Sequence, residues 1–395
     1  MANKKLLITA LLIFTIFSLV GITFASPMTQ DVPKNKIIVF KPGVSEERQE
    51  ELIKRFNINK TKDLRLINGK AVLLSERLEN KLKRLPEILR IDNDVEVFTL
   101  ARFYQLKKYK PQPSQVLPWG IDRIDAERVW ATTSADNVTV GVIDTGIDLK
   151  HPDLQANIKG GYNAINPRKL PQDDNGHGTH VAGIIAALNN DIGVVGVGPK
   201  IDLYAIKVLG ANGSGYLSDV IEGLDWAIQK NIQVVNMSLG TSENVLSFQE
   251  AIQRAYNAGI TIVAAAGNTG GSVLYPAAYP EVIAVSAIDQ YDQIASWSSR
   301  GQEIDFAAPG VSIYSTYKGS SYATLSGTSM AAPHLAGVAA LVLSQLDKCD
   351  INNNGECDPG EVKEKLKNST EDLGSPGWDD LFGFGLVNAE KVVNW

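Results

Sequence analysis

Residues 327–343 read Gly-Thr-Ser-Met-Ala-Ala-Pro-His-Leu-Ala-Gly-Val-Ala-Ala-Leu-Val-Leu. After Pro333 the stretch is apolar and rich in small residues, a pattern typical of a helix that is buried on all sides. Ser329 stands where this helix begins, and free backbone N–H groups and the positive end of the helix dipole gather at such a start. A serine there can be a simple helix cap. It can also be a nucleophile, because the N–H groups beside it would stabilise an oxyanion formed by its attack.

The charge is distributed unevenly along the 395 residues. Over residues 26–113 Lys and Arg outnumber Asp and Glu by 19 to 12, whereas over residues 114–395 they are outnumbered by 17 to 32. A basic segment followed by a strongly acidic one predicts two domains that attract each other, with a boundary near residue 110. The acidic main domain argues against binding to nucleic acid, which needs a basic face.

The N-terminus has the pattern of an export signal. Lys4 and Lys5 precede an apolar run over residues 6–24, which ends in small residues around Ala25. We expect residues 1–25 to be a signal peptide that is cleaved after Ala25, so that the protein is secreted and extracellular. The run is also long enough for an uncleaved membrane anchor, which is the alternative.

Residues 34–100 predict a small α+β unit. Its expected strands are 36–40, 71–74 and 95–98, and its expected helices are 45–56 and 76–85. Nothing in this unit carries catalytic chemistry. Residues 101–118 are polar, contain prolines at 111, 113 and 118, and predict a linker.

After residue 120 strands and helices alternate. The expected strands are 138–143, 203–208, 234–237, 261–265 and 282–287, and the expected helices are 178–188, 218–230 and 246–258. Near-continuous apolar strands that alternate with helices predict a doubly wound, mainly parallel α/β sheet covered on both faces. In such a sheet the active site lies beyond the carboxyl ends of the strands.

Asp144 lies at such an end, directly after the apolar run 140–143. Within Asp-Thr-Gly it could be half of an aspartic protease site. That site needs two carboxylates, however, and no second Asp-Thr-Gly or Asp-Ser-Gly occurs in the chain. A structural aspartate in a turn is the other interpretation.

His177 and His180 lie where a helix of small residues begins. A zinc pair is conceivable, but no third ligand with usable spacing appears and the glutamate of a metalloprotease motif is missing. A general base oriented by Asp144 is the interpretation that we favour. Asn268 ends another apolar strand, where it can be a turn residue or an oxyanion donor.

Together these four stretches resemble the subtilisin-like serine proteases, or subtilases (peptidase S8), over nearly all of residues 115–395. The order Asp, His, Ser is that of subtilisin. The resemblance implies that Ser329 is the nucleophile and that His177 is the general base. It also implies that Asp144 holds the imidazole and that Asn268, with the Ser329 N–H, binds the oxyanion. The implied fold is a subtilisin-like doubly wound α/β domain preceded by a small ferredoxin-like α+β pro-domain.

The resemblance also places the polypeptide substrate. Two segments look like the edges that pair with an extended peptide, namely Gly213, Ser214 and Gly215, and Ser238, Leu239 and Gly240. Leu274 precedes the Tyr-Pro pair that lines the primary specificity pocket in the family, where glycine is common. A leucine there would shorten the pocket, so we expect poor acceptance of large aromatic residues before the cleaved bond.

Residues 34–100 resemble the pro-domain of secreted subtilases, which assists folding and inhibits the enzyme. We therefore expect a signal peptide over 1–25, a pro-domain and cleaved linker over 26–110, and a catalytic domain over 111–395. Because Pro111 and Pro113 flank the nearest bonds, we expect self-cleavage upstream of them, between Ala101 and Tyr109.

Calcium is the expected cofactor, at two sites. The stretch 188–194 looks like the strong calcium loop of the family, and oxygen ligands of the implied kind suit a hard cation. The implied ligands are the side chains of Gln115, Asp153 and Asn190 and the backbone carbonyls of Leu188, Ile192 and Val194.

The second calcium site rests on spacing. Residues 350–361 fit the EF-hand loop template Asp-x-Asn-x-Asn-Gly-x₅-Glu, inside an insertion at 349–361. A plain Asn-Gly turn is the alternative. Cys349 and Cys357, the only two cysteines, bracket the first part of the loop, and in an exported protein we expect them to pair. The expected metal ligands are Asp350, Asn352, Asn354, Glu356 and Glu361.

The sequence thus predicts a secreted, calcium-dependent serine endopeptidase that hydrolyses polypeptides through an acyl-enzyme. We expect it to be made as a self-processing pre-pro-enzyme, with its own pro-domain as chaperone and inhibitor, and to act as a monomer. The alternative is a non-catalytic calcium-binding protein that keeps the subtilase fold. The usual sign of such a protein is a missing member of the triad, and none is missing.

Overall fold

The computed structural model describes residues 31–107 and 112–394. The expected signal peptide and its alternative, a membrane anchor, lie in residues 1–25 and therefore outside the described residues. Within the described part of the chain, no helix is both long and apolar enough to cross a bilayer.

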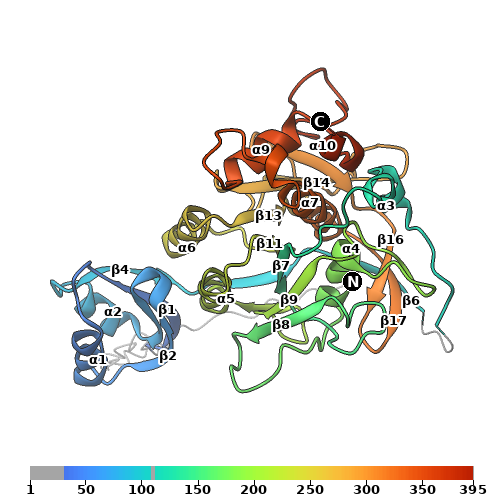
Figure 1. The fold of residues 1–395 in the computed structure, drawn as a ribbon. Coiled ribbons are helices and arrows are strands. Elements are labelled where there is room, and N and C mark those ends of the chain that lie inside the picture. The colour runs from blue at the N-terminus through green and yellow to red at the C-terminus, as the bar shows by residue number, and fades with distance from the viewer. Residues whose placement is uncertain (1–30, 108–111, 395) are drawn as a thin grey trace, which may run out of the picture.

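The small N-terminal domain, blue in Figure 1, is a four-stranded antiparallel sheet in the order β2-β3-β1-β4 with two helices. Ser45 and Ser75 begin these helices, and the hydroxyl of each accepts from a backbone N–H three residues on. The α+β prediction for this unit is confirmed. Its elements are β1 (Lys34–Phe40), α1 (Glu46–Arg55), β2 (Asn59–Leu64), the 3-10 turn η1 (Arg65–Ile67), β3 (Gly69–Leu74), α2 (Glu76–Leu82) and β4 (Ile88–Asn93).

The large domain is built on a seven-stranded parallel sheet in the order β15-β14-β13-β11-β7-β9-β8. This confirms the prediction of a doubly wound α/β fold. The strand order reverses direction between β7 and β11, and a ligand site is expected at such a point. The strands are β7 (Thr139–Asp144), β8 (Ile158–Asn163), β9 (Asp202–Lys207), β11 (Val234–Met237), β13 (Thr261–Ala265), β14 (Val282–Ile288) and β15 (Phe306–Pro309).

Side chains of this sheet alternate between two cores. On β13, Val263 and Ala265 belong to one core, whereas Ile262 and Ala264 belong to the other. The first core lies under α4 (His177–Ala186) and α7 (Thr328–Leu343), which pack on each other. The second lies under α5 (Leu217–Gln229) and α6 (Leu246–Asn257). Burial on both faces explains why the strands are apolar almost throughout.

The small domain packs on the N-terminal ends of α5 and α6, at the left of the large domain in Figure 1. Both oxygens of Asp94 accept hydrogen bonds from Ser218, one from its backbone N–H and one from its hydroxyl, each at 2.8 Å. Oδ2 of Asp92 accepts hydrogen bonds from both the backbone N–H and the hydroxyl of Ser247, at 3.1 and 2.5 Å. A carboxylate is favourable at a helix N-terminus because free N–H groups and the positive end of the dipole lie there.

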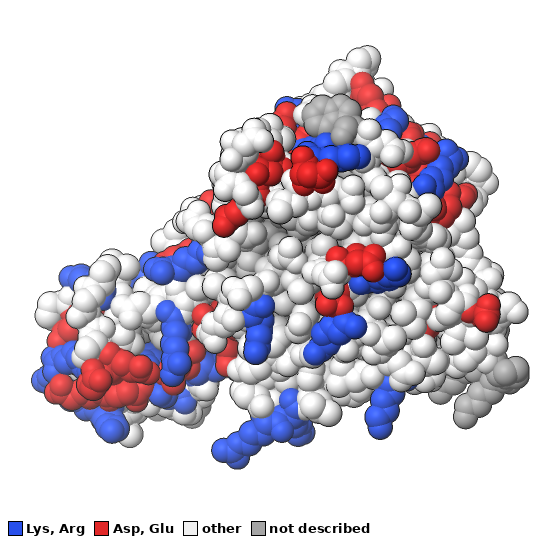
Figure 2. Space-filling model, viewed as in Figure 1, with Lys and Arg blue, Asp and Glu red and all other residues white. Residues whose placement is uncertain are grey.

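Ion pairs join the same two domains. Lys62 contacts Asp219 and Glu222 at 3.0 and 2.7 Å, and Arg90 contacts Glu250 at 2.8 Å. On the face shown in Figure 2, however, charged side chains of both signs crowd the small domain. The expected attraction between a basic and an acidic domain therefore rests on these specific pairs.

Two segments depart from the predictions. Residues 95–98 were expected to be the third strand of the small unit, but β5 (Glu96–Thr99) leaves that sheet. It lies between β10 (Ser214–Tyr216) and β12 (Leu239–Gly240) of the large domain. Residues 101–118 were expected to be a linker, but β6 (Arg102–Lys107) pairs with β17 (Ser321–Ser326), the partner of β16 (Ile313–Tyr317).

The remaining helices are short. They are α3 (Trp119–Arg123), the 3-10 turn η2 (Glu127–Val129), α8 (Leu346–Cys349), α9 (Pro359–Lys367) and α10 (Ala389–Asn394). Helices α9 and α10 lie at the top of Figure 1, close to α7. A disulfide joins Cys349 to Cys357, which confirms the expected pairing.

Candidate active site

Asp144 and His177 lie side by side at the carboxyl end of the sheet. Asp144 is the last residue of β7 and His177 is the first residue of α4. Nδ1 of His177 lies 2.8 Å from Oδ1 and 2.9 Å from Oδ2 of Asp144, and both side chains are buried. The contact favours the tautomer with its proton on Nδ1. Nε2 of His177 has no hydrogen-bond partner among the described residues and is free to accept a proton.

A second buried carboxylate, Asp173, holds the loop that leads to His177. Burial raises the pKa of Asp173. Because its bonds fix both the start of α4 and the turn after Asp144, Asp173 fixes the two ends of the contact between Asp144 and His177. Sequence reasoning gave no role to Asp173. Its oxygens accept hydrogen bonds from backbone N–H groups and hydroxyls of Thr145, Asn175, Gly176 and Thr179.

Ser329 lies in the first turn of α7 and is fully buried. Its Oγ donates to the carbonyl oxygen of Ser238 at 3.0 Å, and the hydroxyl of Ser238 donates to the carbonyl oxygen of Ser329 at 2.9 Å. The latter carbonyl is free for Ser238 because Pro333, four residues on, has no N–H to donate. A proline inside the helix thus allows the backbone of Ser329 to be fixed from outside it.

The carbonyl oxygen of Leu100 lies between two N–H donors. Nδ2 of Asn268 donates to it at 2.6 Å, and the backbone N–H of Ser329 donates at 3.2 Å. A Cβ on Gly327 would lie 2.3 Å from the same oxygen, so the carbonyl can come this close only beside a glycine. The peptide bond between Leu100 and Ala101 therefore lies beside Ser329, with its oxygen where an oxyanion would be stabilised.

Thr328 orients the amide of Asn268. Oδ1 of Asn268 accepts hydrogen bonds from the backbone N–H and the hydroxyl of Thr328, at 2.9 and 3.0 Å. Because that oxygen is engaged, the NH₂ group faces the carbonyl of Leu100. Sequence reasoning missed this role, since a threonine at a helix start signals only a possible cap.

The chain before Leu100 lies extended between the two predicted substrate edges. Its strand β5 is antiparallel to both β10 and β12, which is the arrangement of a peptide added to a sheet. Backbone N–H groups of Thr99 and Leu100 donate to the carbonyl oxygens of Gly213 and Ser238, at 3.0 and 3.3 Å. The paired residues are Phe98 with Ser214 and Gly240, Val97 with Gly215, and Thr99 with Leu239.

Leu100 packs close to Leu274, the residue that the sequence assigned to the specificity pocket. Its side chain is only 4% exposed and belongs to the same core cluster as Leu274. A Cβ on Gly240 would lie 3.2 Å from a methyl carbon of Leu100 and 3.3 Å from Cβ of Leu274. Leu274 also covers Gly267, where a Cβ would lie 2.9 Å from its Cγ. Leu274 therefore limits the room beside the side chain of Leu100.

The predicted ligands of the first calcium site converge around Asp153. Its carboxylate accepts from Nδ2 of Asn190 and from the N–H of Val194, each at 2.9 Å. Nε2 of Gln115 donates to the carbonyl oxygens of Leu188 and Val194, at 2.8 and 3.3 Å. An amide turned through 180° presents an oxygen at the same place, so Gln115 and Asn190 can also serve as oxygen ligands.

The donor set of this loop fits a hard cation. Asp153 is fully buried, and burial raises its pKa to about 6. Ile192 lies in the same loop, where its N–H donates to Oδ1 of Asn190 at 2.8 Å. Among the described residues, no three His, Cys, Asp or Glu side chains gather into a metal-binding group, so the site would depend on amide and backbone oxygens beside one carboxylate.

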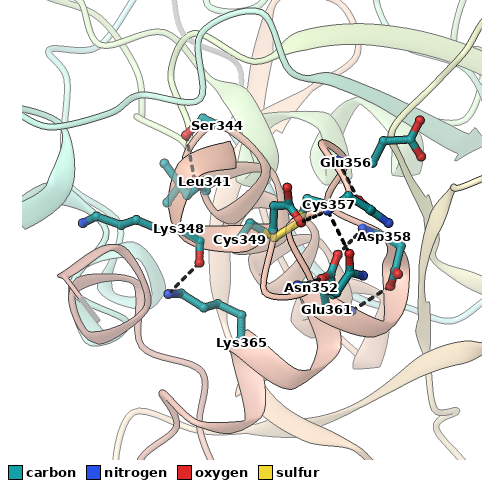
Figure 3. The surroundings of a disulfide bond; sticks show 12 residues. Leu341, Ser344, Lys348, Cys349, Asn352, Glu356, Cys357, Asp358, Glu361 and Lys365 are labelled. Atoms are coloured by element: carbon teal, nitrogen blue, oxygen red, sulfur yellow. Dashed lines mark hydrogen bonds between the residues drawn. A yellow bond between two sulfur atoms is a disulfide. The ribbon is translucent and has the colours of Figure 1, made fainter.

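The EF-hand-like loop folds around the carboxylates of Asp350 and Glu361. Figure 3 shows Glu361 and Asn352 of this loop near the disulfide. Asp350 accepts from the N–H groups of Asn354 and the following glycine, at 2.9 and 2.7 Å. Glu361 accepts from the N–H of Asn352 at 2.9 Å and also forms the capping box at the start of α9. Glu356 donates its N–H to Oδ1 of Asn354 at 2.8 Å. The oxygens of both carboxylates thus turn toward the loop, as a cation would require.

The sequence profile of the subtilase family, peptidase S8, matches residues 135–385. The chain is a subtilase. The thermostable alkaline protease of Halalkalibacterium halodurans is 42% identical over 383 residues, 96% of this chain and 98% of that protein. Subtilisin E of Bacillus subtilis is 38% identical over 406 residues, 100% of both chains. Subtilisin Savinase of Lederbergia lenta is 47% identical over 282 residues, 71% of this chain and 100% of that protein.

This subtilase is therefore a subtilisin-type serine endopeptidase that acts on polypeptides. The alternative of a non-catalytic calcium-binding protein is not retained. The similarity to subtilisin E extends over the small N-terminal domain as well as the catalytic domain.

Proposed function

We propose that this subtilase cuts its own chain between Leu100 and Ala101. The observation that carries the proposal is the carbonyl oxygen of Leu100, which accepts hydrogen bonds from both Asn268 and Ser329. This bond lies directly before the range from Ala101 to Tyr109 in which the sequence predicted self-cleavage. The sequence did not reveal it, because the strands that fix β5 in the cleft lie far along the chain.

In the proposed reaction, Oγ of Ser329 turns from Ser238 toward Nε2 of His177, gives up its proton and attacks the carbonyl carbon of Leu100. Such catalytic contacts often tighten only in the productive complex. The negative charge that forms on the oxygen is stabilised by the N–H groups of Asn268 and Ser329. Asp144 stays ionised and stabilises the imidazolium through Nδ1.

The second half of the reaction returns the proton. His177 donates it to the nitrogen of Ala101, the C–N bond breaks, and Leu100 remains as an ester on Ser329. His177 then takes a proton from a water molecule, whose oxygen attacks the ester. His177 passes this proton to Oγ of Ser329 as the ester bond breaks, which regenerates the serine and releases the Leu100 carboxylate. Other polypeptides would follow the same steps, with a leucine-like residue in the pocket beside Leu274.

We propose that residues 26–100 act as a chaperone before the cut and remain bound as a non-covalent inhibitor after it. Strand β5 fills the cleft, while Asp92 and Asp94 bind the starts of α6 and α5. The same contacts would assist folding, because they join helices and edge strands of the catalytic domain before its sheet is complete.

We propose that calcium binds the two loops described above and stabilises the folded enzyme. Bound calcium would neutralise the charge of Asp153 and link residue 115 to the loop 188–194.

To test this, thermal unfolding is followed with and without chelator in an inactive Ser329→Ala background, which cannot digest itself. Calcium at about 100 times its Kd contributes roughly 2.7 kcal/mol. Asp153→Asn and Asp350→Asn should each remove part of the rise in Tm that calcium causes. A protein with both sites intact and the same Tm with and without chelator would contradict the proposal.

We also propose that the protein is exported and acts as a monomer. The support for export is the signal pattern of residues 1–25 and the disulfide, which persists in oxidising compartments. Secretion of active enzyme into the medium, together with the mass of the folded species in solution, tests both points.

The catalytic roles are tested by hydrolysis of a peptide that carries the sequence Val-Phe-Thr-Leu-Ala of residues 97–101. Ser329→Ala and His177→Ala should each abolish cleavage after leucine, while the wild-type enzyme is blocked by a serine-directed inhibitor. Cleavage that persists in Ser329→Ala would overturn the assignment.

A further inference from the structure

The chain that follows the proposed cut stays beside the active site. Residues 102–107 form β6, which is antiparallel to β17 along five backbone pairs. The pairing starts at Ser326 with Arg102 and ends at Tyr322 with Lys107. Figure 1 shows β6 beside β17 at the lower right of the large domain. Because β17 leads into Gly327 and α7, β6 occupies the side of the cleft that receives residues after a scissile bond.

Further along the chain, residues 113–116 are hydrogen-bonded to the loop 188–194. The N–H of Gly193 donates to the carbonyl oxygen of Pro113 at 2.8 Å, and the N–H of Val116 donates back to the carbonyl oxygen of Gly193 at 2.9 Å. Gln115 adds a backbone bond to Asp191 at 3.1 Å besides its side-chain contacts. In the uncut chain, β17 and the loop 188–194 therefore hold both ends of the segment 101–116 at once.

Hydrolysis of the bond between Leu100 and Ala101 breaks none of these contacts. We propose that residues 101–107, the arm, remain on β17 after the cut and inhibit the enzyme in cis by covering the leaving-group side of the cleft. The inference rests on the proposed cut. If the arm stays in place, removal of the small domain opens only the part of the cleft that binds residues before the cleaved bond. The leaving-group side remains covered by residues 101–107.

The arm competes effectively with substrate for the edge of β17 because it is tethered to the enzyme. A short tether gives an effective concentration in the millimolar range, which exceeds the concentration of most dissolved substrates. An extended polypeptide must add its own strand to the edge of β17 and therefore has to displace the arm. A short substrate that ends in a small leaving group makes no contact there and escapes the competition.

The test compares two substrates that share residues before the cleaved bond. One continues for six residues after it, whereas the other ends in a small chromogenic leaving group. Gln105→Pro removes a backbone N–H and interrupts the pairing of β6, while Gln105→Ala keeps the backbone intact and is the matched control. We expect Gln105→Pro to raise kcat/KM severalfold for the long substrate, to leave it unchanged for the short one, and Gln105→Ala to change neither.

A ratio of long-substrate to short-substrate kcat/KM that is equal in all three proteins would overturn the inference, provided that intact mass shows Ala101 as the N-terminus. An N-terminus beyond residue 107 in freshly processed enzyme would contradict both the cut and the arm. Hydrogen exchange gives an independent measurement. The amides of residues 102–107 should be as protected in processed wild-type enzyme as in uncut Ser329→Ala, and loss of protection on processing would also overturn the inference.

Discussion

The amide nitrogen of Asn268 lies 2.6 Å from the carbonyl oxygen of Leu100, although 168 residues separate them in the sequence. This contact joins the oxyanion site to the proposed cleavage point of the same chain. Replacing Asn268 by Ala removes one of the two donors that would stabilise the developing charge.

We expect Asn268→Ala to lower kcat by about 10²–10³ with little change in KM, the loss typical of one oxyanion donor, for which subtilisin itself is the reference case. Steady-state kinetics on a short peptide measures it. Thr328→Val should cause a smaller loss, because the amide stays but loses one of the bonds that orient it, and Thr328→Ser should retain activity. A loss confined to KM in Asn268→Ala would contradict the oxyanion role.

In the proposed peptidase, Leu274 limits the size of the primary specificity pocket. We expect Leu274→Gly to improve acceptance of Phe and Tyr before the cleaved bond relative to Leu, because it removes the side chain that packs beside Leu100. Relative kcat/KM values for a series of peptides that differ only at this residue provide the measurement. Leu170→Gly, at a residue that is 73% exposed, is the control and should leave the preference unchanged. An unaltered preference in Leu274→Gly would show that the pocket is limited elsewhere.

Asp94 fixes the small domain to α5. Each hydrogen bond that it makes as a charged acceptor is worth roughly 1.5–3 kcal/mol, so Asp94→Ala should weaken inhibition by the processed domain at least about tenfold. The lag between processing and the appearance of peptidase activity should shorten accordingly. Glu96→Gln, at an exposed residue of β5, is the matched control. Equal lags in the two variants would mean that the contact with Ser218 contributes little to inhibition.

Buried histidines make stability depend on pH, and burial lowers the pKa of three of them, His151, His180 and His334. Burial lowers the pKa of His180 to about 3 and that of His334 to about 4. In the unfolded chain these groups titrate near pH 6.5. Below that pH the unfolded chain takes up protons that the folded chain does not, so the free energy of unfolding should fall by up to about 1.4 kcal/mol per pH unit for each histidine.

This dependence can be measured by denaturant unfolding of the inactive Ser329→Ala protein between pH 7 and about 4. His334→Gln should make the slope shallower, because one of the buried histidines has been removed. An identical slope in that variant would assign the acid sensitivity to carboxylates instead.

Sequence reasoning located most of the large domain because its signals are local. The apolar runs that became β11 and β13 lie within the predicted ranges, and α5 and α6 differ from their predicted bounds by one residue at most. The structure joins Asp144 to His177, and it joins Asn268 to Ser329 through the carbonyl of Leu100, with α4 packed on α7. These residues lie at or just after the end of a strand, or in the first turn of a helix. Such positions meet at one edge of a parallel sheet, so periodicity alone indicates their neighbourhood.

Strand pairings between segments that are distant in the chain could not be predicted from the sequence. Residues 96–99 have the composition of any exposed strand, and only the fold shows that β10 and β12 pair with them. The same holds for β6, which was expected to be linker, and for Thr328 and Asp173, which act through their neighbours. Asp173 accepts hydrogen bonds from three residues of its own loop and from the distant Thr145, and only the fold shows the contact with Thr145.

Intact mass and N-terminal sequencing of the chain, made in parallel as wild type and as Ser329→Ala, test the central claim most directly. If the bond in the oxyanion site is the one that the enzyme cuts, wild-type protein should yield a catalytic fragment that begins at Ala101. The Ser329→Ala protein should keep residues 26–395 in one piece. A fragment that begins at Ala101 in the Ser329→Ala protein, or a wild-type cut at another bond, would contradict it.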